Sequence, residues 1–105
     1  MKKDNHINNI IKNVIKEYLP DGEAMLFGSR AKDTAGSDSD FDILVVTRRD
    51  LAPAENLFFR SKIRKRLLQE GIRSDILISS REEIETKKRL PGHIIRRIIK
   101  EAVML

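Results

Sequence analysis

The sequence predicts a small α/β (α+β) domain, in which helices pack on a small mixed β-sheet. Three observations lead to this fold class. Two segments repeat apolar residues at the spacing of an amphipathic helix, and three short apolar runs have the length of buried strands. Helical and strand segments are interspersed along the chain, which is typical of helices packed on a sheet. At 105 residues, we expect residues 1–105 to form a single domain.

The first helix is predicted by apolar residues that fall on one helical stripe: Ile7, Ile10, Ile11, Val14, Ile15, Tyr18 and Leu19. Asp4 or Asn5 can cap its start, and the turn-forming residues 20–22 end it. A short apolar strand over 23–27 follows and stops at Gly28. Residues 35–39 read as a loop, and residues 41–47, rich in β-branched side chains, give the clearest strand of the chain.

The second half predicts a helix, a strand and two more helices. Residues 54–69 are helical, with Pro53 near the first turn and a thin apolar stripe of Phe59, Ile63 and Leu67. Residues 72–79 form a third strand, and Ser80 with Glu83 makes a capping box for the next helix. A last amphipathic helix is predicted by a stripe that follows a Pro-Gly break: Ile94, Ile95, Ile98, Ile99, Ala102 and Val103. We expect this helix to cover the sheet, with a face wide enough for a dimer or partner contact.

Composition narrows the chemistry. With no Cys and two His, disulfide frameworks, thiolate zinc sites and histidine-based triads are disfavoured, so catalysis would rest on carboxylates, hydroxyls, Lys or Arg. Lys and Arg number 21 and Asp and Glu 16, a formal charge of +5, which favours an anionic partner without naming it. No apolar stretch approaches the length of a membrane span, and we expect a cytoplasmic protein.

Gly28-Ser29-Arg30 lies where a strand ends and a short helix is expected to begin. A Gly there allows the backbone to approach a ligand, and the amides at a helix start favour a phosphate. Taken alone, the pair Gly-Ser is more often an ordinary turn.

Three carboxylates stand near this turn in the predicted fold. Asp40 and Asp42 point to one face of their strand, about 6–7 Å apart, and at an effective dielectric near 20 they repel by roughly 3 kcal/mol. Asp75 interrupts the next apolar strand and can join them if the two strands pair. Divalent cations such as Mg²⁺ turn such repulsion into a binding site. Without that convergence, Asp40 is a turn residue and Asp42 a solvated edge residue.

The segments 28–31 (Gly-Ser-Arg-Ala) and 40–45 (Asp-Phe-Asp-Ile-Leu-Val), with ten residues (30–39) between Ser29 and Asp40, resemble the signature of the DNA polymerase β-type nucleotidyltransferase superfamily. More closely, the chain is similar to the minimal nucleotidyltransferases (MNT) that pair with HEPN proteins. The resemblance covers roughly residues 7 to 79, and together with Asp75 it implies the polymerase β-type nucleotidyltransferase fold.

The resemblance also implies roles. Gly28, Ser29 and Arg30 would bind the nucleotide phosphates, and Asp40, Asp42 and Asp75 would be catalytic and hold two Mg²⁺ ions. The implied reaction is attack of an acceptor hydroxyl on the α-phosphate of ATP, with pyrophosphate leaving. The implied partner is a HEPN-type toxin, which such an antitoxin neutralises in some pairs by adding AMP to a tyrosine.

Two other functions stay open at this point. The chain could be a catalytically silent antitoxin that blocks its partner by complex formation, or a basic nucleic-acid-binding protein. Five basic residues within 60–66 are explained by a solvated helix, by an acidic partner or by RNA, although no aromatic residues interleave with them for base stacking. The nucleotide base and the acceptor are not readable from the sequence.

Overall fold

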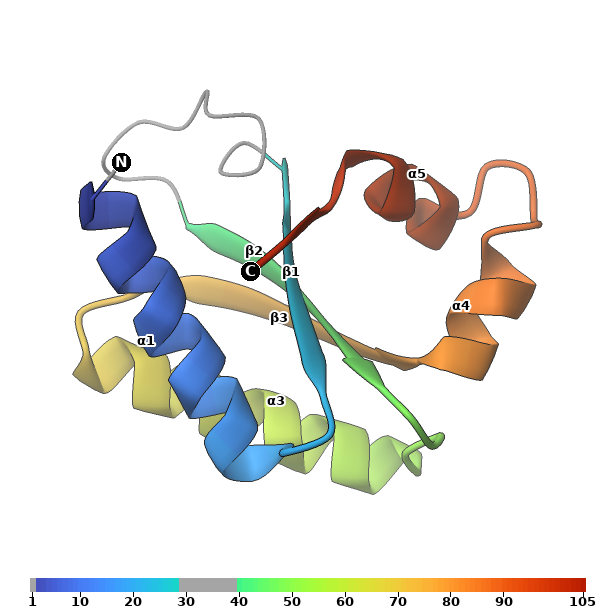
Figure 1. Cartoon of the computed structure of the whole chain (residues 1–105). Coiled ribbons are helices and arrows are strands. Elements are labelled where there is room, and N and C mark those ends of the chain that lie inside the picture. Colours follow the sequence, from blue (N-terminus) through green and yellow to red (C-terminus); the bar gives the residue numbers. More distant parts are fainter. Residues whose placement is uncertain (1, 29–39) are drawn as a thin grey trace.

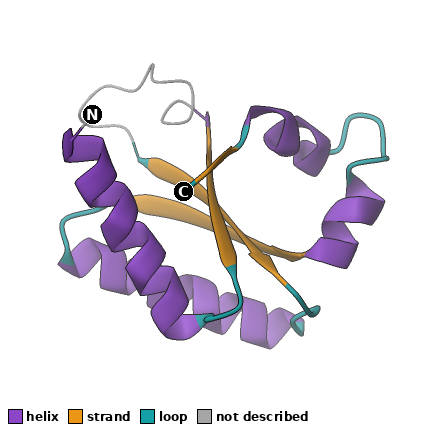
Figure 2. Ribbon diagram, viewed as in Figure 1, coloured by secondary structure: helices purple, strands orange, loops and turns teal. Residues whose placement is uncertain are grey.

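The computed structural model describes residues 2–28 and 40–105, with side chains from residue 6 onward. The elements follow in the order α1 (Lys2–Tyr18), β1 (Glu23–Phe27), β2 (Phe41–Thr47), α3 (Pro53–Gln69), β3 (Ser74–Ser80), α4 (Arg81–Lys87), α5 (Ile94–Glu101) and β4 (Val103–Met104). The four strands form one sheet in the order β3-β2-β1-β4 (Figure 2). β2 and β3 are parallel, whereas β1 is antiparallel to both β2 and β4, so the mixed sheet predicted from the sequence is confirmed.

The two faces of the sheet are covered by different helices (Figure 1). Along β2, Ile43 and Val45 join a core with α1 and α3, while Leu44 and Val46 join a second core with α4 and α5. This alternation follows from the two-residue side-chain period of a strand. β2 lies between β3 and β1 and packs into both cores, so it holds Asp42, near its start, in a fixed position. Among the described residues, no helix is both long and apolar enough to cross a membrane.

Several local predictions are confirmed. β1 and β2 have the predicted bounds, and Pro53 is the first residue of α3, where its missing amide hydrogen costs nothing. The capping box of α4 is present: the Ser80 amide donates to Oε1 of Glu83 at 3.0 Å, and the Glu83 amide donates to Oγ of Ser80 at 3.1 Å. Ile95 and Ile98 of α5 are buried against the sheet, as the apolar stripe predicts.

Two predicted helix boundaries are wrong, and the third strand, expected over 72–79, runs over Ser74–Ser80. α1 begins at Lys2, so Asp4 and Asn5 lie inside the helix and not at its cap, because extending a helix adds a hydrogen bond with each residue. The last helix ends at Glu101 and does not continue to Val103. Val103 pairs with Leu26 at the otherwise open edge of β1, where backbone hydrogen bonds outweigh one more helical residue. The predicted loop over 35–39 lies outside the described residues.

Candidate active site

Two of the three predicted carboxylates stand opposite each other. The parallel register of β2 and β3 makes Asp42 the direct partner of Asp75, and register partners in adjacent strands project to the same face. Asp40 precedes β2, two residues before Asp42. Asp42 is half-buried, and Asp40 and Asp75 are exposed. The structure therefore gathers these acids at one end of the sheet, where β2 and β3 begin.

The electrostatics of Asp42 reflect this crowding. Burial raises the pKa of the Asp42 carboxyl above its usual value of 3.8, and the negative charges of Asp75 and then Asp40 raise this pKa further. Each of these effects disfavours the ionised form of Asp42. A cation bound between the carboxylates would reverse them, since it adds a positive charge where negative charges now repel.

Gly28 sits against Asp42 from the other side. It follows β1, whose last residue, Phe27, is the register partner of Asp42. The φ angle of Gly28 is +70°, a left-handed conformation that favours glycine, and a Cβ at this position would overlap Oδ2 of Asp42. The absence of a side chain thus lets the β1 turn approach the carboxylate. Ser29 and Arg30, the other predicted phosphate-binding residues, lie outside the described residues.

Asp40 has a cationic neighbour that the sequence does not indicate. Its Oδ1 lies 3.3 Å from Nε of Arg73, and both side chains are more than half exposed. Within residues 2–28 and 40–105, no three acidic, His or Cys side chains already converge tightly enough to hold a metal ion. The oxygen donors of Asp40, Asp42 and Asp75 nevertheless suit Mg²⁺, and the crowded Asp42 carboxyl is the kind of group that a cation stabilises. The residues present therefore fit Mg²⁺ in chemistry, provided that Asp40 turns from Arg73.

A cavity of about 700 Å³ opens beside the acids. On one side lie the three acids together with Ser74 and Ile76 of β3, and the opposite wall comes from α3 alone: Leu57, Arg60, Ser61, Arg64, Lys65 and Leu68. Sequence reasoning assigned the basic residues of α3 to solvent, to an acidic partner or to RNA, and missed that three of them, Arg60, Arg64 and Lys65, line the same cavity as the acids. A signal was present, because these six residues recur every three to four positions, on a stripe separate from the buried Ile63 and Leu67.

Comparison with known proteins supports the fold. The family model described as a nucleotidyltransferase domain matches residues 7–105. Among solved structures, a toxin–antitoxin complex with AMP-PNP is 18% identical, with a TM-score of 0.62 over 92% of this chain and 70% of that chain. A tri-AMPylated Shewanella oneidensis HEPN toxin in complex with MNT antitoxin gives 16% identity and a TM-score of 0.57, over 95% of this chain and 69% of that chain.

A third structure is of a protein named as a minimal nucleotidyltransferase. It is 19% identical, with a TM-score of 0.61 over 99% of this chain and 94% of that chain. No curated protein matches the sequence. The match of the family model over nearly the whole chain, on a fold that carries paired carboxylates beside a glycine turn, leads to one assignment: the chain belongs to the nucleotidyltransferase domain family.

Proposed function

We propose that the chain transfers AMP from ATP to a hydroxyl group of a partner protein, and that it acts as the antitoxin of a HEPN-type toxin. The observation that carries this proposal is the pairing of Asp42 with Asp75 across β2 and β3, with Gly28 packed against Asp42. In this arrangement the turn at Gly28, which would bind the phosphates, lies beside two carboxylates at one end of the sheet, where a nucleotide and an acceptor could meet.

The proposed direction of the reaction follows the order of these groups across the sheet. Gly28 follows β1, Asp42 lies on β2 and Asp75 on β3, so the phosphates would lie toward β1 and the acceptor toward β3. The acceptor oxygen forms a bond to the α-phosphorus, and the bond from that phosphorus to the bridging oxygen breaks. Pyrophosphate leaves with the bonding electrons, and the hydroxyl proton passes to the carboxylate of Asp75.

Asp40, Asp42 and Asp75 would hold Mg²⁺. When bound, these ions would neutralise the negative charge on the attacking and leaving oxygens. The chain itself contributes positioning and electrostatics, and no covalent nucleophile is required. The similar fold of a complex solved with AMP-PNP, and of an MNT antitoxin bound to an AMPylated HEPN toxin, supports ATP as the donor and a HEPN protein as the acceptor.

The test is intact-mass analysis of a HEPN-type protein from the neighbouring reading frame after incubation with this chain, ATP and Mg²⁺. We expect a mass gain equal to AMP with the unmodified chain and none with Asp40→Asn/Asp42→Asn. Asp21→Asn/Glu82→Gln is the matched control, because it removes the same charge from exposed positions on other elements and should transfer AMP normally. Absence of any mass gain with the unmodified chain would refute the transferase.

A silent antitoxin is the second candidate, and the contact between Asp40 and Arg73 favours it, since this contact already gives one of the acids a cationic partner without a metal ion. In that case the Asp40→Asn/Asp42→Asn variant still neutralises the toxin, and no mass gain occurs. Neutralisation that depends on ATP, Mg²⁺ and both acids excludes this candidate.

A further inference from the structure

The cavity beside the acids is bordered by the outer edge of β3. β3 is the last strand on its side of the sheet, and among the described residues no strand pairs with its outer edge. Nδ2 of Asn56 donates to the carbonyl of Ile78 at 2.9 Å, so Ile78 directs its backbone groups toward α3. Because strand residues alternate in the direction of their backbone groups, Ser74 and Ile76 face the same way. These two residues line the cavity, so their backbone donors and acceptors are available in it.

Two buried polar atoms at this cavity have no hydrogen-bond partner among the described residues: Oγ of Ser74 and Nε of Arg60. Ser74 is 6% exposed. Buried polar atoms without a partner are rare in folded proteins, because leaving one unsatisfied costs about 1–3 kcal/mol. Both atoms stand on walls of the cavity, one on β3 and the other on α3, which indicates that a polar ligand completes the site.

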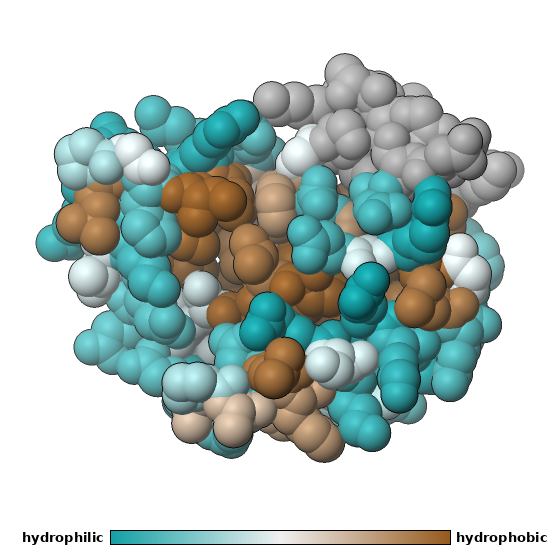
Figure 3. Space-filling model, turned by 180° about the vertical axis from the view of Figure 1, so that it is seen from behind, coloured by the Kyte–Doolittle hydropathy of each residue, from teal (hydrophilic) through white to brown (hydrophobic). Residues whose placement is uncertain are grey.

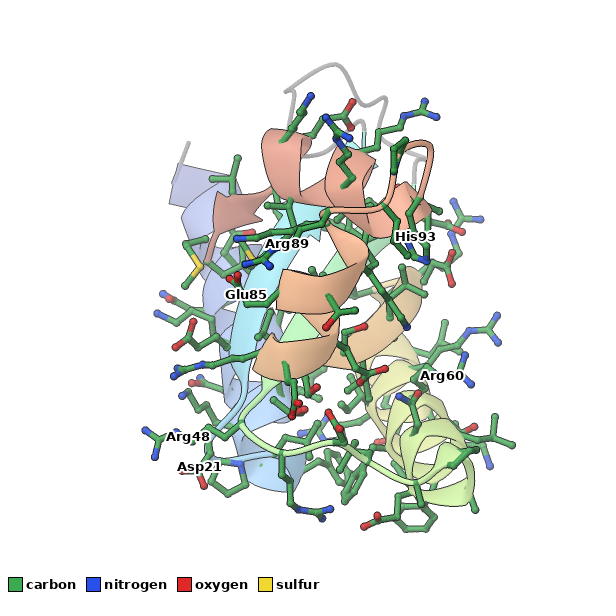
Figure 4. The ribbon with its side chains drawn as sticks, turned by 90° about the vertical axis from the view of Figure 1, so that its right-hand side faces the viewer. Asp21, Arg48, Arg60, Glu85, Arg89 and His93 are labelled. Atoms are coloured by element: carbon green, nitrogen blue, oxygen red, sulfur yellow. The ribbon has the colours of Figure 1, made fainter. Side chains whose placement is uncertain are left out.

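The charge of the α3 wall identifies the kind of ligand. Arg60, Arg64 and Lys65 form no ion pair with a described residue, whereas Arg66, on the same helix, is 2.7 Å from Glu70. Figure 4 shows Arg60 on α3, well away from Asp21 and Arg48. Three cations on one wall favour an acidic ligand, and Leu57 and Leu68, both about half exposed, supply apolar surface between them.

Figure 3, seen from behind, shows hydrophobic residues interspersed with hydrophilic ones over this face of the molecule. A polypeptide uses both kinds of contact, and its backbone matches the available groups of Ser74 and Ile76. RNA would not need a strand edge, and the cavity has no aromatic residue on which a base could stack.

We propose that an extended, acidic segment of the acceptor protein binds between β3 and α3, adding a strand to the edge at Ser74 and Ile76. Main-chain hydrogen bonds to β3 hold the segment, and Arg60, Arg64 and Lys65 select acidic side chains on it. An added strand lies about 4.8 Å from β3, so its side chains on the face of Asp42 and Asp75 are delivered next to these acids. This inference rests on the proposed function, because it says how the hydroxyl reaches Asp75.

The first experiment measures binding alone, without ATP or Mg²⁺, by fluorescence anisotropy. The probe is a labelled random copolymer of glutamate and tyrosine, compared with a copolymer of lysine and tyrosine and with a single-stranded RNA of similar length. We expect the acidic copolymer to bind best. Arg64→Glu/Lys65→Glu should weaken its binding by at least about tenfold, because it reverses two charges of the wall. Arg96→Glu/Arg97→Glu, on α5, makes the same charge change away from the groove and should leave binding within about twofold of the unmodified chain.

The second experiment measures hydrogen exchange with the copolymer bound. The amides of Ser74 and Ile76 should gain protection, while those of Asp75 and Leu77, which face β2, should not change. Any of four results would overturn the proposal. The basic copolymer could bind as tightly as the acidic one, RNA could bind more tightly, the α5 variant could lose as much affinity as Arg64→Glu/Lys65→Glu, or the amides of Ser74 and Ile76 could gain no protection. Transfer of AMP is then assayed separately: copolymer that binds in the groove without receiving AMP refutes the transferase and leaves the docking groove intact.

Discussion

Gly28 and Asp42 stand so close that a Cβ on Gly28 would overlap Oδ2 of the aspartate. Gly28 directly follows β1 and Asp42 lies on the antiparallel neighbour β2, and their approach depends on the left-handed backbone of Gly28. Gly28→Ala must therefore displace the carboxylate or the turn. We expect this variant to lose Mg²⁺- and ATP-dependent thermal stabilisation, measured by Tm with and without both ligands.

Gly71→Ala is the matched control for this prediction. Gly71 has a φ of +77°, close to that of Gly28, but a Cβ there would meet no atom within 4 Å. Both variants lose about 1 kcal/mol from the left-handed backbone, and only Gly28→Ala should also lose the response to ligands. An equal response of the two variants would show that the contact with Asp42 has no role in ligand binding.

The raised pKa of Asp42 predicts a gain in stability when its charge is removed. The unfolded chain releases this proton near 3.8, and the folded chain releases it at a higher pH, so the Asp42 contribution to stability falls as pH rises through this interval. At pH 7 in EDTA, Asp42→Asn should have a higher Tm than the unmodified chain. The gain is below about 1 kcal/mol, because solvent screens a carboxylate that is only partly buried.

The difference in Tm should shrink as pH is lowered toward 3.8, where the unfolded chain also holds the proton. Adding Mg²⁺ at pH 7 should raise the Tm of the unmodified chain and leave that of Asp42→Asn nearly unchanged. A lower Tm for Asp42→Asn in EDTA would mean that the carboxylate stabilises the fold, in contradiction to its surroundings.

The ion pair of Arg73 with Asp40 predicts competition with a cation. Arg73→Gln frees the Asp40 carboxylate, and the apparent affinity for Mg²⁺, measured by calorimetry, should rise by about two- to fivefold, the equivalent of an exposed ion pair. Arg49→Gln is the control, since Arg49 pairs at 3.0 Å with Glu55 at the start of α3 and should not alter Mg²⁺ affinity. If Arg73→Gln leaves the affinity for Mg²⁺ unchanged, Arg73 does not compete with Mg²⁺ for the Asp40 carboxylate.

The hydrogen bonds of Ser80 stabilise the fold independently of the candidate active site. It is 1% exposed, accepts from the Glu83 amide to cap α4, and donates to Oδ1 of Asp50. Ser80→Ala should lower the free energy of unfolding by about 1–2 kcal/mol, measured in urea. Ser79→Ala, at a buried neighbour outside the cap, should cost less; an equal cost would argue against the cap as the cause.

Much of the fold and part of the site could be read from the chain alone. The β-branched side chains of Phe41–Thr47 predict a strand, and the Ser80 to Glu83 spacing predicts a helix start. The spacing of Asp40 and Asp42 and the acidic interruption at Asp75 indicate a shared site. The strand and the helix start depend on residues within a few positions of one another, where strand and helix periods act directly. The shared site of the three acids stays a prediction.

What the sequence determined by itself is therefore the helices and the three longer strands, the acids and the family signature. The tertiary structure decided which strands pair: β3 parallel to β2 brings Asp75 beside Asp42, and β4 joins β1 where the sequence predicted only more helix. It also decided that Arg73 contacts Asp40 and that Arg60, Arg64 and Lys65 line the same cavity as the acids. The physical reason is that helix and strand periods set the direction of each side chain locally, whereas the packing of distant segments sets which side chains meet.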